Sequence, residues 1–280
     1  MSYTPYHLIV VSAVLTTSIF GQTTSPVQSA ARPFKLDIAA PVQLAASDAA
    51  SRAFQTNVLP GMLKLADLSL SERKNITNSN SISLDPSKLV LSSDATVRVY
   101  FLSEGAGYRN SLGISTTGKG PLGKDAELIF PNASSAVGYG GTKSLVRTSN
   151  EPLAAGDFVN LGTYKAGTSL DFFLIADGAG GGSNYFSTDK SLNKDGIVHA
   201  VSLTKDGSAY LLISFEDMLG GGDKDYNDVL FAVEIGKTNV NKLAGLSAPE
   251  PTLAMGSVLV AGLLMGFTRR RQPRSESSPT

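Results

Sequence analysis

The chain has 280 residues, and its 24 basic and 24 acidic side chains cancel to a formal net charge of zero. This balance disfavours a nucleic-acid-binding protein, which needs a concentrated basic surface. Cysteine is absent, so disulfides cannot hold the chain together, whereas 42% hydrophobic residues supply material for a core. The 28 glycines among short apolar runs favour an all-β body with many turns.

The amino terminus has the pattern of a secretory signal. Residues 8–20 form an apolar run of signal-peptide length that is short for a stable membrane span. We predict a signal peptide over residues 1–21, although no lysine or arginine precedes the run and cleavage near Ala30 or Ala31 is an alternative. Residues 22–33, rich in Ser, Thr, Gln and Pro, predict an extended linker.

A helical pattern follows in residues 45–70. Phe54, Val58, Met62 and Leu65 recur at steps of three and four residues. Because Pro60-Gly61 interrupts the pattern, we predict a break in the helix or two short helices at that point. Residues 71–86 are polar and predict a loop. We therefore expect residues 22–87 to be a partly helical extension, either packed on the main domain or separate from it.

Strand patterns begin at residue 88. Val97, Val99 and Phe101 alternate with more polar neighbours, which is the period of a β-strand. Glycine-rich turns are predicted at residues 103–113 and 177–183, and a spacer at residues 237–248. These short strands predict an all-β domain, a β-sandwich or jelly-roll-like barrel, over residues 88–236. The predicted strands cover residues 96–101, 127–130, 158–164, 170–176, 197–203, 209–216 and 229–235.

The densest chemistry lies in an acidic loop before the last strand. Three glycines, residues 220–222, let the backbone curl tightly. Carboxylates about 4 Å apart repel each other by roughly 4 kcal/mol per pair at an effective dielectric constant near 20. A divalent cation removes this cost, and Ca²⁺ suits such a site because it accepts six to eight oxygen ligands in irregular geometry. The predicted ligands are Glu216, Asp217, Asp223, Asp225, Asn227 and Asp228.

Two simpler interpretations of the acidic loop stay open. Acidic residues beside glycines often form a solvated turn, or their carboxylates accept hydrogen bonds from loop amides without any metal. The spacing of Asp223, Asp225 and Asn227 imitates an EF-hand. We reject an EF-hand because its sixth position requires glycine and holds Asp228, and because residues 229–235 alternate like a strand.

Other candidates carry weaker signals. Asp177 or Asn184 could supply an oxygen to the same cation, with a flexible hairpin loop as the slightly favoured alternative. His199 lies in a strand pattern without a cysteine partner, so a structural role is favoured over zinc binding. No Gly-x-Ser-x-Gly or P-loop motif is present, and we expect no enzymatic activity. Tyrosines that could stack on sugars or cap a sheet edge are Tyr100, Tyr108, Tyr139, Tyr185 and Tyr226.

The carboxyl terminus has three parts in a fixed order. Pro249-Glu250-Pro251 precedes an uncharged apolar run, residues 252–268, and then Arg269-Arg270-Arg271. Seventeen helical residues at about 1.5 Å each reach about 25 Å, just enough to cross a hydrocarbon layer. Arginines stay on the cytoplasmic side, so the body should face outward. A buried core helix with a basic end is the alternative.

This tripartite end, residues 249–274, resembles the PEP-CTERM sorting signal of Gram-negative, biofilm-forming bacteria. The resemblance implies export through the inner membrane, recognition by an exosortase, and cleavage near Pro249-Glu250-Pro251. The mature protein would then be attached to the envelope or released outside the cell.

Several motifs of the body point to one family. They are residues 105–113, residues 172–178, Leu192-Asn193, His199, Phe215-Glu216-Asp217 and residues 222–228. On these motifs the body resembles the DUF4114 family of bacterial secreted proteins, over residues 88–236. The resemblance implies a domain boundary and an all-β fold, and it implies no activity because the family has no known function. Calcium is inferred from ligand chemistry alone.

These patterns together predict a non-enzymatic module of the cell surface or extracellular matrix, ordered by calcium at the acidic loop. The alternative is a calcium-dependent carbohydrate-binding module for exopolysaccharide, and a polysaccharide-active enzyme is the least favoured class. The expected partners are an exosortase during processing, and afterwards exopolysaccharide or other surface proteins.

Overall fold

The computed structural model describes residues 27–70, 82–137 and 146–245 of the chain. Within these ranges, ten strands form two antiparallel sheets, and three short α-helices accompany them. The predicted signal peptide and the predicted sorting signal lie outside the described residues. No helix within the described ranges is long and apolar enough to span a membrane.

The helices and strands have the following bounds. The α-helices are α1 (Ala49–Asn57), α2 (Leu59–Ser69) and α3 (Gly236–Leu243). The strands are β1 (Ile82–Leu84), β2 (Ala95–Ser103), β3 (Ser111–Ser115), β4 (Glu127–Phe130), β5 (Phe158–Tyr164), β6 (Asp171–Ile175), β7 (Tyr185–Ser187), β8 (Ala200–Thr204), β9 (Tyr210–Phe215) and β10 (Val229–Glu234). Short 3-10 helices lie at Pro33–Lys35, Pro86–Lys88, Gly120–Leu122, Gly178–Gly180 and Lys190–Leu192.

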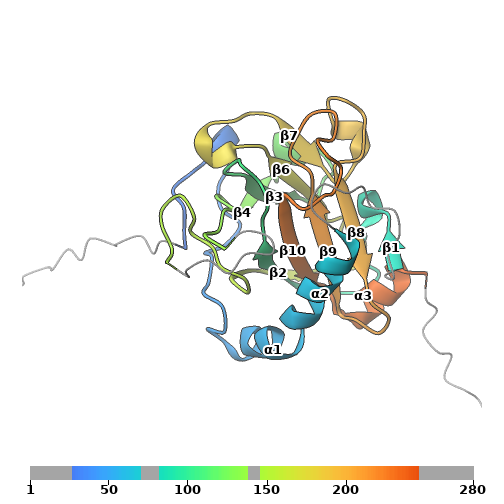
Figure 1. Ribbon diagram of the computed structural model, residues 1–280. Coiled ribbons are helices and arrows are strands. Elements are labelled where there is room, and N and C mark those ends of the chain that lie inside the picture. The colour runs from blue at the N-terminus through green and yellow to red at the C-terminus, as the bar shows by residue number, and fades with distance from the viewer. Residues whose placement is uncertain (1–26, 71–81, 138–145, 246–280) are drawn as a thin grey trace, which may run out of the picture.

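The two sheets lie face to face as a sandwich (Figure 1). The six-stranded sheet has the order β1-β8-β9-β10-β2-β5, and the four-stranded sheet has the order β4-β3-β6-β7. Every strand pair is antiparallel. The predicted β-rich, sandwich-like body is therefore confirmed.

The central strands of the six-stranded sheet are buried on both faces. In β10, Phe231 and Val233 join the core between the sheets, whereas Leu230 and Ala232 face the opposite side. Strand β2 divides its side chains in the same way. Because successive strand residues point to opposite faces, a strand covered on both sides needs apolar residues throughout.

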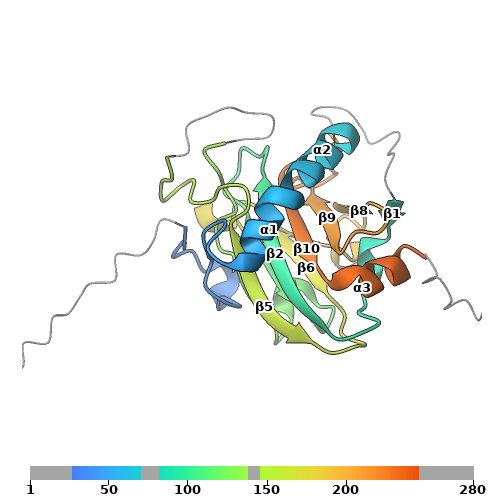
Figure 2. The same cartoon turned by 90° about the horizontal axis from the view of Figure 1, so that it is seen from below.

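Helices α1 and α2 supply the cover on the outer face, where they cross strands β2, β10 and β9 (Figure 2). Phe54 of α1 stacks on Tyr100 of β2, with ring centroids 3.8 Å apart and an interplanar angle of 9°. The two predicted short helices are confirmed, and the helical region packs on the sandwich. The break falls at Val58, because Pro60 is tolerated in the first turn of α2.

Three strands and one helix differ from the predictions. Strand β1 lies within the predicted loop of residues 71–86, and β3 begins within the predicted turn of residues 103–113 and continues to Ser115. Gly113 lies inside β3 and not in a turn. Glycine is needed there because a Cβ would come within 2.3 Å of the Phe173 ring. Strand β7 had no predicted counterpart.

Helix α3 replaces the first part of the predicted spacer. Its Val240 is buried against the core, and its Asn239 Oδ1 accepts hydrogen bonds from the N–H groups of Ser92 (2.7 Å) and Ser93 (2.9 Å). The prediction of a spacer is therefore wrong for residues 237–243, since a short helix with only two buried residues, Asn239 and Val240, gives little periodic signal.

Candidate metal site

The acidic loop joins β9 to β10 at the end of the sandwich remote from α3 (Figure 1). Phe215, the last residue of β9, pairs with Val229, the first residue of β10. This pairing places Glu216 and Asp217 opposite Asp228 as the chain leaves and re-enters the sheet. The N–H of Asp217 donates to Asp228 Oδ2 over 2.8 Å.

The loop gathers its carboxylates into two overlapping groups. Glu216, Asp223 and Asp225 form the first group, and Glu216, Asp217 and Asp228 form the second. Within each group the oxygen atoms lie within 4.8 Å of one another. All five predicted carboxylates are thus brought together, with Glu216 shared, and such groups can hold a metal ion.

Asn227 is buried at the same place, but its contacts are with neighbouring side chains. Its Nδ2 donates to Asp225 Oδ2 over 2.7 Å, and its Oδ1 faces Gly105. A Cβ on Gly105 would approach that oxygen to 2.7 Å, so glycine is needed there. Asn227 supports Asp225, and its role as a ligand stays a prediction.

Glu216 has a buried oxygen without a partner. The residue is only 3% exposed, and its Oε2 has no hydrogen-bond partner among the described residues. A buried polar atom without a partner costs about 1–3 kcal/mol, and a charged one costs more. An oxygen that lacks a partner inside a ring of carboxylates has the chemistry of a metal ligand.

The electrostatics of the cluster are unfavourable for a protein without bound cations. Burial raises the pKa of Glu216 to about 7, and repulsion from Asp223, Asp217 and Asp225 adds to the effect. Burial and the nearby Asp217 raise the pKa of Asp228 to about 8. Burial also raises the pKa of Asp217, against the opposing hydrogen bond from Asn110.

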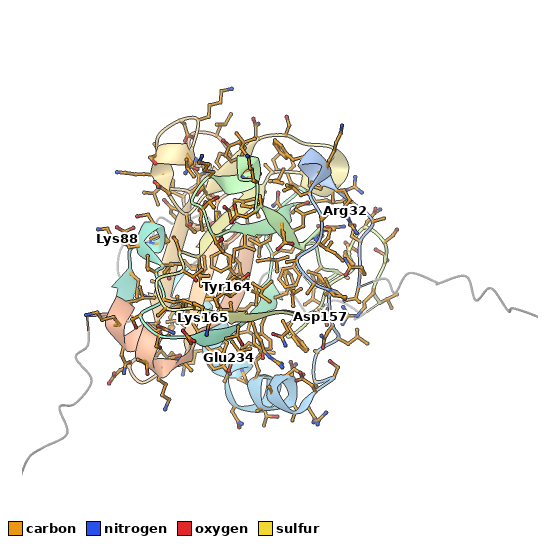
Figure 3. The ribbon with its side chains drawn as sticks, turned by 180° about the vertical axis from the view of Figure 1, so that it is seen from behind. Arg32, Lys88, Asp157, Tyr164, Lys165 and Glu234 are labelled. Carbon is orange, nitrogen blue, oxygen red and sulfur yellow. The ribbon has the colours of Figure 1, made fainter. Side chains whose placement is uncertain are left out.

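Buried carboxylates elsewhere in the fold have partners. Asp157, at the start of β5 (Figure 3), pairs with Arg147, whose Nη2 donates to Asp157 Oδ1 over 2.9 Å. Asp171 accepts hydrogen bonds from the hydroxyls of Ser187 and Thr188. No lysine or arginine pairs with Glu216, Asp217 or Asp228 within the described ranges, and Glu216 Oε2 lacks even a hydrogen-bond donor there.

Two supporting residues come from the loop between β2 and β3 and were missed by the sequence analysis. Asn110 is 1% exposed; its Nδ2 donates to Asp217 Oδ2 over 2.8 Å, and its Oδ1 accepts from the Asp177 N–H over 3.0 Å. Glu104 is also buried, and burial raises its pKa to about 7 although it accepts hydrogen bonds from the Ser135 and Ala106 N–H groups. The strand register brings this loop to the site, since Ser103 pairs with Leu230.

Of the two weaker candidates, Asp177 lies beside the cluster rather than in it. It is absent from both carboxylate groups, and it reaches Asp217 through the Asn110 side chain. The loop that holds Asp177 and Asn184 is closed by backbone hydrogen bonds, including Gly182 N–H to Asp177 O and Ala176 N–H to Asn184 O. A role of either residue in holding the ion stays a prediction.

His199 has the structural role that was predicted. It is fully buried and stacks on Phe186 with ring centroids 3.8 Å apart. Its Nδ1 donates to the Glu216 carbonyl over 3.1 Å, because a carbonyl oxygen only accepts, and its Nε2 lies 2.9 Å from Asp195 Oδ2. His199 therefore fixes the backbone at the start of the acidic loop.

The family model described as a domain of unknown function, DUF4114, matches residues 164–236. The matched part runs from the end of β5 to the start of α3 and contains the whole acidic loop. It is shorter than the similarity expected over residues 88–236. No curated protein and no solved structure matches the chain.

Two glycines of the loop allow a matched test of the geometry. Gly222 and Gly220 both have positive φ, 45° and 80°, but only at Gly222 would a Cβ meet Glu216 Oε1, at 1.8 Å. We expect Gly222→Ala to displace Glu216 and weaken metal binding at least tenfold by isothermal titration calorimetry. Gly220→Ala should cost only the strain of the left-handed backbone, about 1–2 kcal/mol in urea unfolding. Equal metal affinities of the two variants would contradict this account.

The raised pKa values predict how stability depends on pH in metal-free protein. Unfolding lowers the pKa of Glu216 from about 7 to 4.5 and that of Asp228 from about 8 to 3.8, so the folded state binds more protons between pH 4 and 8. The free energy of unfolding should therefore fall as pH rises through this window. Urea unfolding with a chelator measures it, and Glu216→Gln should flatten the slope. A free energy that rises with pH would refute the assignment.

Proposed function

We propose that this chain is a non-enzymatic module of the bacterial cell surface or extracellular matrix, and that calcium orders the loop between β9 and β10. The observation that carries the proposal is the shared Glu216, whose Oε2 has no partner among the described residues while carboxylates of both groups surround it. A doubly charged ion would supply that partner and cancel the repulsion.

The donor set favours calcium over other divalent ions. Every candidate ligand of the cluster offers oxygen, whereas structural zinc sites are built mainly from cysteine and histidine. Magnesium requires near-ideal octahedral geometry and keeps several waters. Two overlapping groups that share one glutamate form an irregular site, which calcium tolerates with six to eight ligands.

The same cluster argues against acid–base catalysis. A glycosidase needs one carboxylic acid and one carboxylate on either side of a bond. Here Glu216 is 3% exposed and Asp217 is 5% exposed, and both lie within a larger set of acids. Such crowding serves a bound cation better than a pair of groups that must reach a substrate.

The proposal of export rests on the sequence. The Pro249-Glu250-Pro251 motif, the apolar residues 252–268 and Arg269-Arg270-Arg271 lie outside the described residues, as does the amino-terminal apolar run. A cysteine-free domain suits this route, because its folding needs no disulfide formation outside the cytoplasm. An exosortase is the proposed processing partner.

Calcium should stabilise the purified domain against unfolding. At a hundred times its dissociation constant, one calcium ion adds about 2.7 kcal/mol to the free energy of unfolding. Thermal melting in calcium and in chelator measures the difference. In Glu216→Gln we expect a higher melting temperature than wild type in chelator, because one repelling charge is gone, and almost no gain from calcium.

Asp67→Asn is the matched control, because Asp67 is an exposed acid on α2 and belongs to neither carboxylate group. It should keep the full calcium gain. Identical melting curves of the wild-type protein in calcium and in chelator would remove the metal from the proposal.

Export can be tested separately in exosortase-bearing cells. Replacement of Arg269-Arg270-Arg271 by serines should remove the cytoplasmic stop, and replacement of Glu250 by alanine should block processing. Both variants should accumulate as full-length protein in the membrane fraction or medium, whereas wild type is shortened. Wild-type protein that retains residues 249–280 at the surface would overturn this part of the proposal.

A further inference from the structure

A groove lies directly beside the acidic cluster. Two adjoining cavities of about 390 and 270 Å³ share Ser183, Asn184 and Leu219. Asp217 of the carboxylate cluster lines the first cavity, so one end of the groove touches the candidate metal site. The combined volume is that of a pocket for a small ligand.

The walls of the groove carry apolar surface that faces solvent. Tyr108 is 45% exposed, Met218 51% and Leu219 44%. Tyr185 lines the second cavity and is held edge-on by Phe34, with ring centroids 6.1 Å apart. Large side chains exposed together beside a cavity indicate a binding surface, and a tyrosine offers a flat apolar face with a polar tip.

The same walls carry polar groups that have unused hydrogen-bonding capacity. No side-chain hydrogen bond of Ser183 or Asn184 to another described residue is found. Asp177 is set in a left-handed conformation, φ 48°, and its Oδ1 accepts from the Arg109 N–H over 3.1 Å. These groups offer hydroxyl, amide and carboxylate bonds beside an aromatic ring.

The charges select among possible ligands. Asp177 and Asp217 line the end near the cluster, and Lys194 is the one cationic side chain among the lining residues, at the other end. Carboxylates accept hydrogen bonds from hydroxyl groups and repel anions. The groove therefore suits an uncharged ligand rich in hydroxyls that also has an apolar face, which describes a neutral sugar.

We propose that this groove binds a neutral sugar unit of a glycan, with one ring face on Tyr108 and hydroxyls bonded to Asp177 and Asn184. The calcium dependence of this binding rests on the proposed function. Asn110 joins the two sites, because the same amide holds Asp217 and the Asp177 N–H. An ion on Asp217 thus fixes the wall that carries Asp177.

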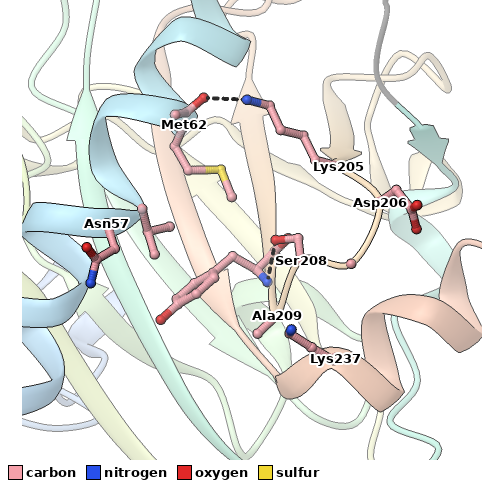
Figure 4. Close-up of a pocket in the computed structure, with 11 residues that line it drawn as sticks. Asn57, Met62, Lys205, Asp206, Ser208, Ala209 and Lys237 are labelled. Atoms are coloured by element: carbon pink, nitrogen blue, oxygen red, sulfur yellow. Dashed lines mark hydrogen bonds between the residues drawn. The ribbon is translucent and has the colours of Figure 1, made fainter.

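A further cavity, away from the groove, has different chemistry. It has a volume of about 360 Å³ and lies between α2, the β8–β9 hairpin and α3 (Figure 4). Lys205 and Lys237 line it, and Lys205 Nζ donates to Gly61 O over 3.2 Å. Substitution of Lys237 in this cavity therefore provides a control for sugar binding outside the groove.

Saturation-transfer difference NMR tests the inference with defined probes. The probes are the methyl glycosides of glucose, galactose and mannose, with methyl glucuronide as the anionic counterpart, each at millimolar concentration with calcium. We expect transfer to at least one neutral glycoside and little to the glucuronide. Tyr108→Ala should abolish the transfer while calcium affinity and melting temperature stay unchanged, and Lys237→Gln should bind as wild type.

The outcomes separate this inference from the calcium proposal. If calcium binds but no saturation transfer to any neutral glycoside is seen, the proposal of a sugar-binding groove is wrong and the proposal of the metal site is unaffected. Transfer that survives Tyr108→Ala, or that is lost in Lys237→Gln, places the sugar elsewhere and overturns the inference. Transfer that requires Tyr108 but persists in chelator and in Glu216→Gln supports the groove and removes its dependence on calcium.

Discussion

The repulsion among carboxylates at the end of β9 and β10 is the constraint on which the functional end of this molecule depends. Glu216, Asp217 and Asp228 are held together by a backbone that is itself well bonded, through the Asp217 N–H to Asp228 Oδ2 and the His199 ring to Glu216 O. The fold cannot relieve the repulsion by letting the loop swing away. It must bind a cation or keep protons on the acids, and the raised pKa values of Glu216 and Asp228 express the second response.

The sandwich supplies the stiffness that this arrangement needs. Burial of β2 and β10 on both faces, by the second sheet and by α1 and α2, holds the strand ends in register. Loops that are far apart in the sequence then meet at one end of the sandwich, since Ser103 pairs with Leu230 and Ser111 pairs with Ile175. The acidic loop, the loop with Asn110 and the loop with Asp177 converge for this reason alone.

The sequence was sufficient for features that depend on local pattern. Short apolar or alternating runs predicted most strands, and the density of acids on both sides of three glycines predicted which carboxylates would cluster. The sequence did not predict features in which a residue is needed for a contact with a part of the chain distant in sequence. Gly113 suggested a turn but makes room for Phe173, and nothing in the local sequence linked Asn110 to its partner Asp217, which is 107 residues away. Helix α3 depends mainly on Val240 and Asn239, too few residues for periodicity to reveal.

The position of Asn110 suggests why the metal site and the groove are neighbours. A buried amide with both ends engaged cannot rotate without losing two hydrogen bonds, so the wall that carries Asp177 is coupled to the state of Asp217. When Asp217 holds a proton in place of an ion, the Asn110 Nδ2–H bond loses its charged acceptor and weakens. A cation would therefore act on the groove through the acceptor strength of one carboxylate, with no need for a large movement of the loop.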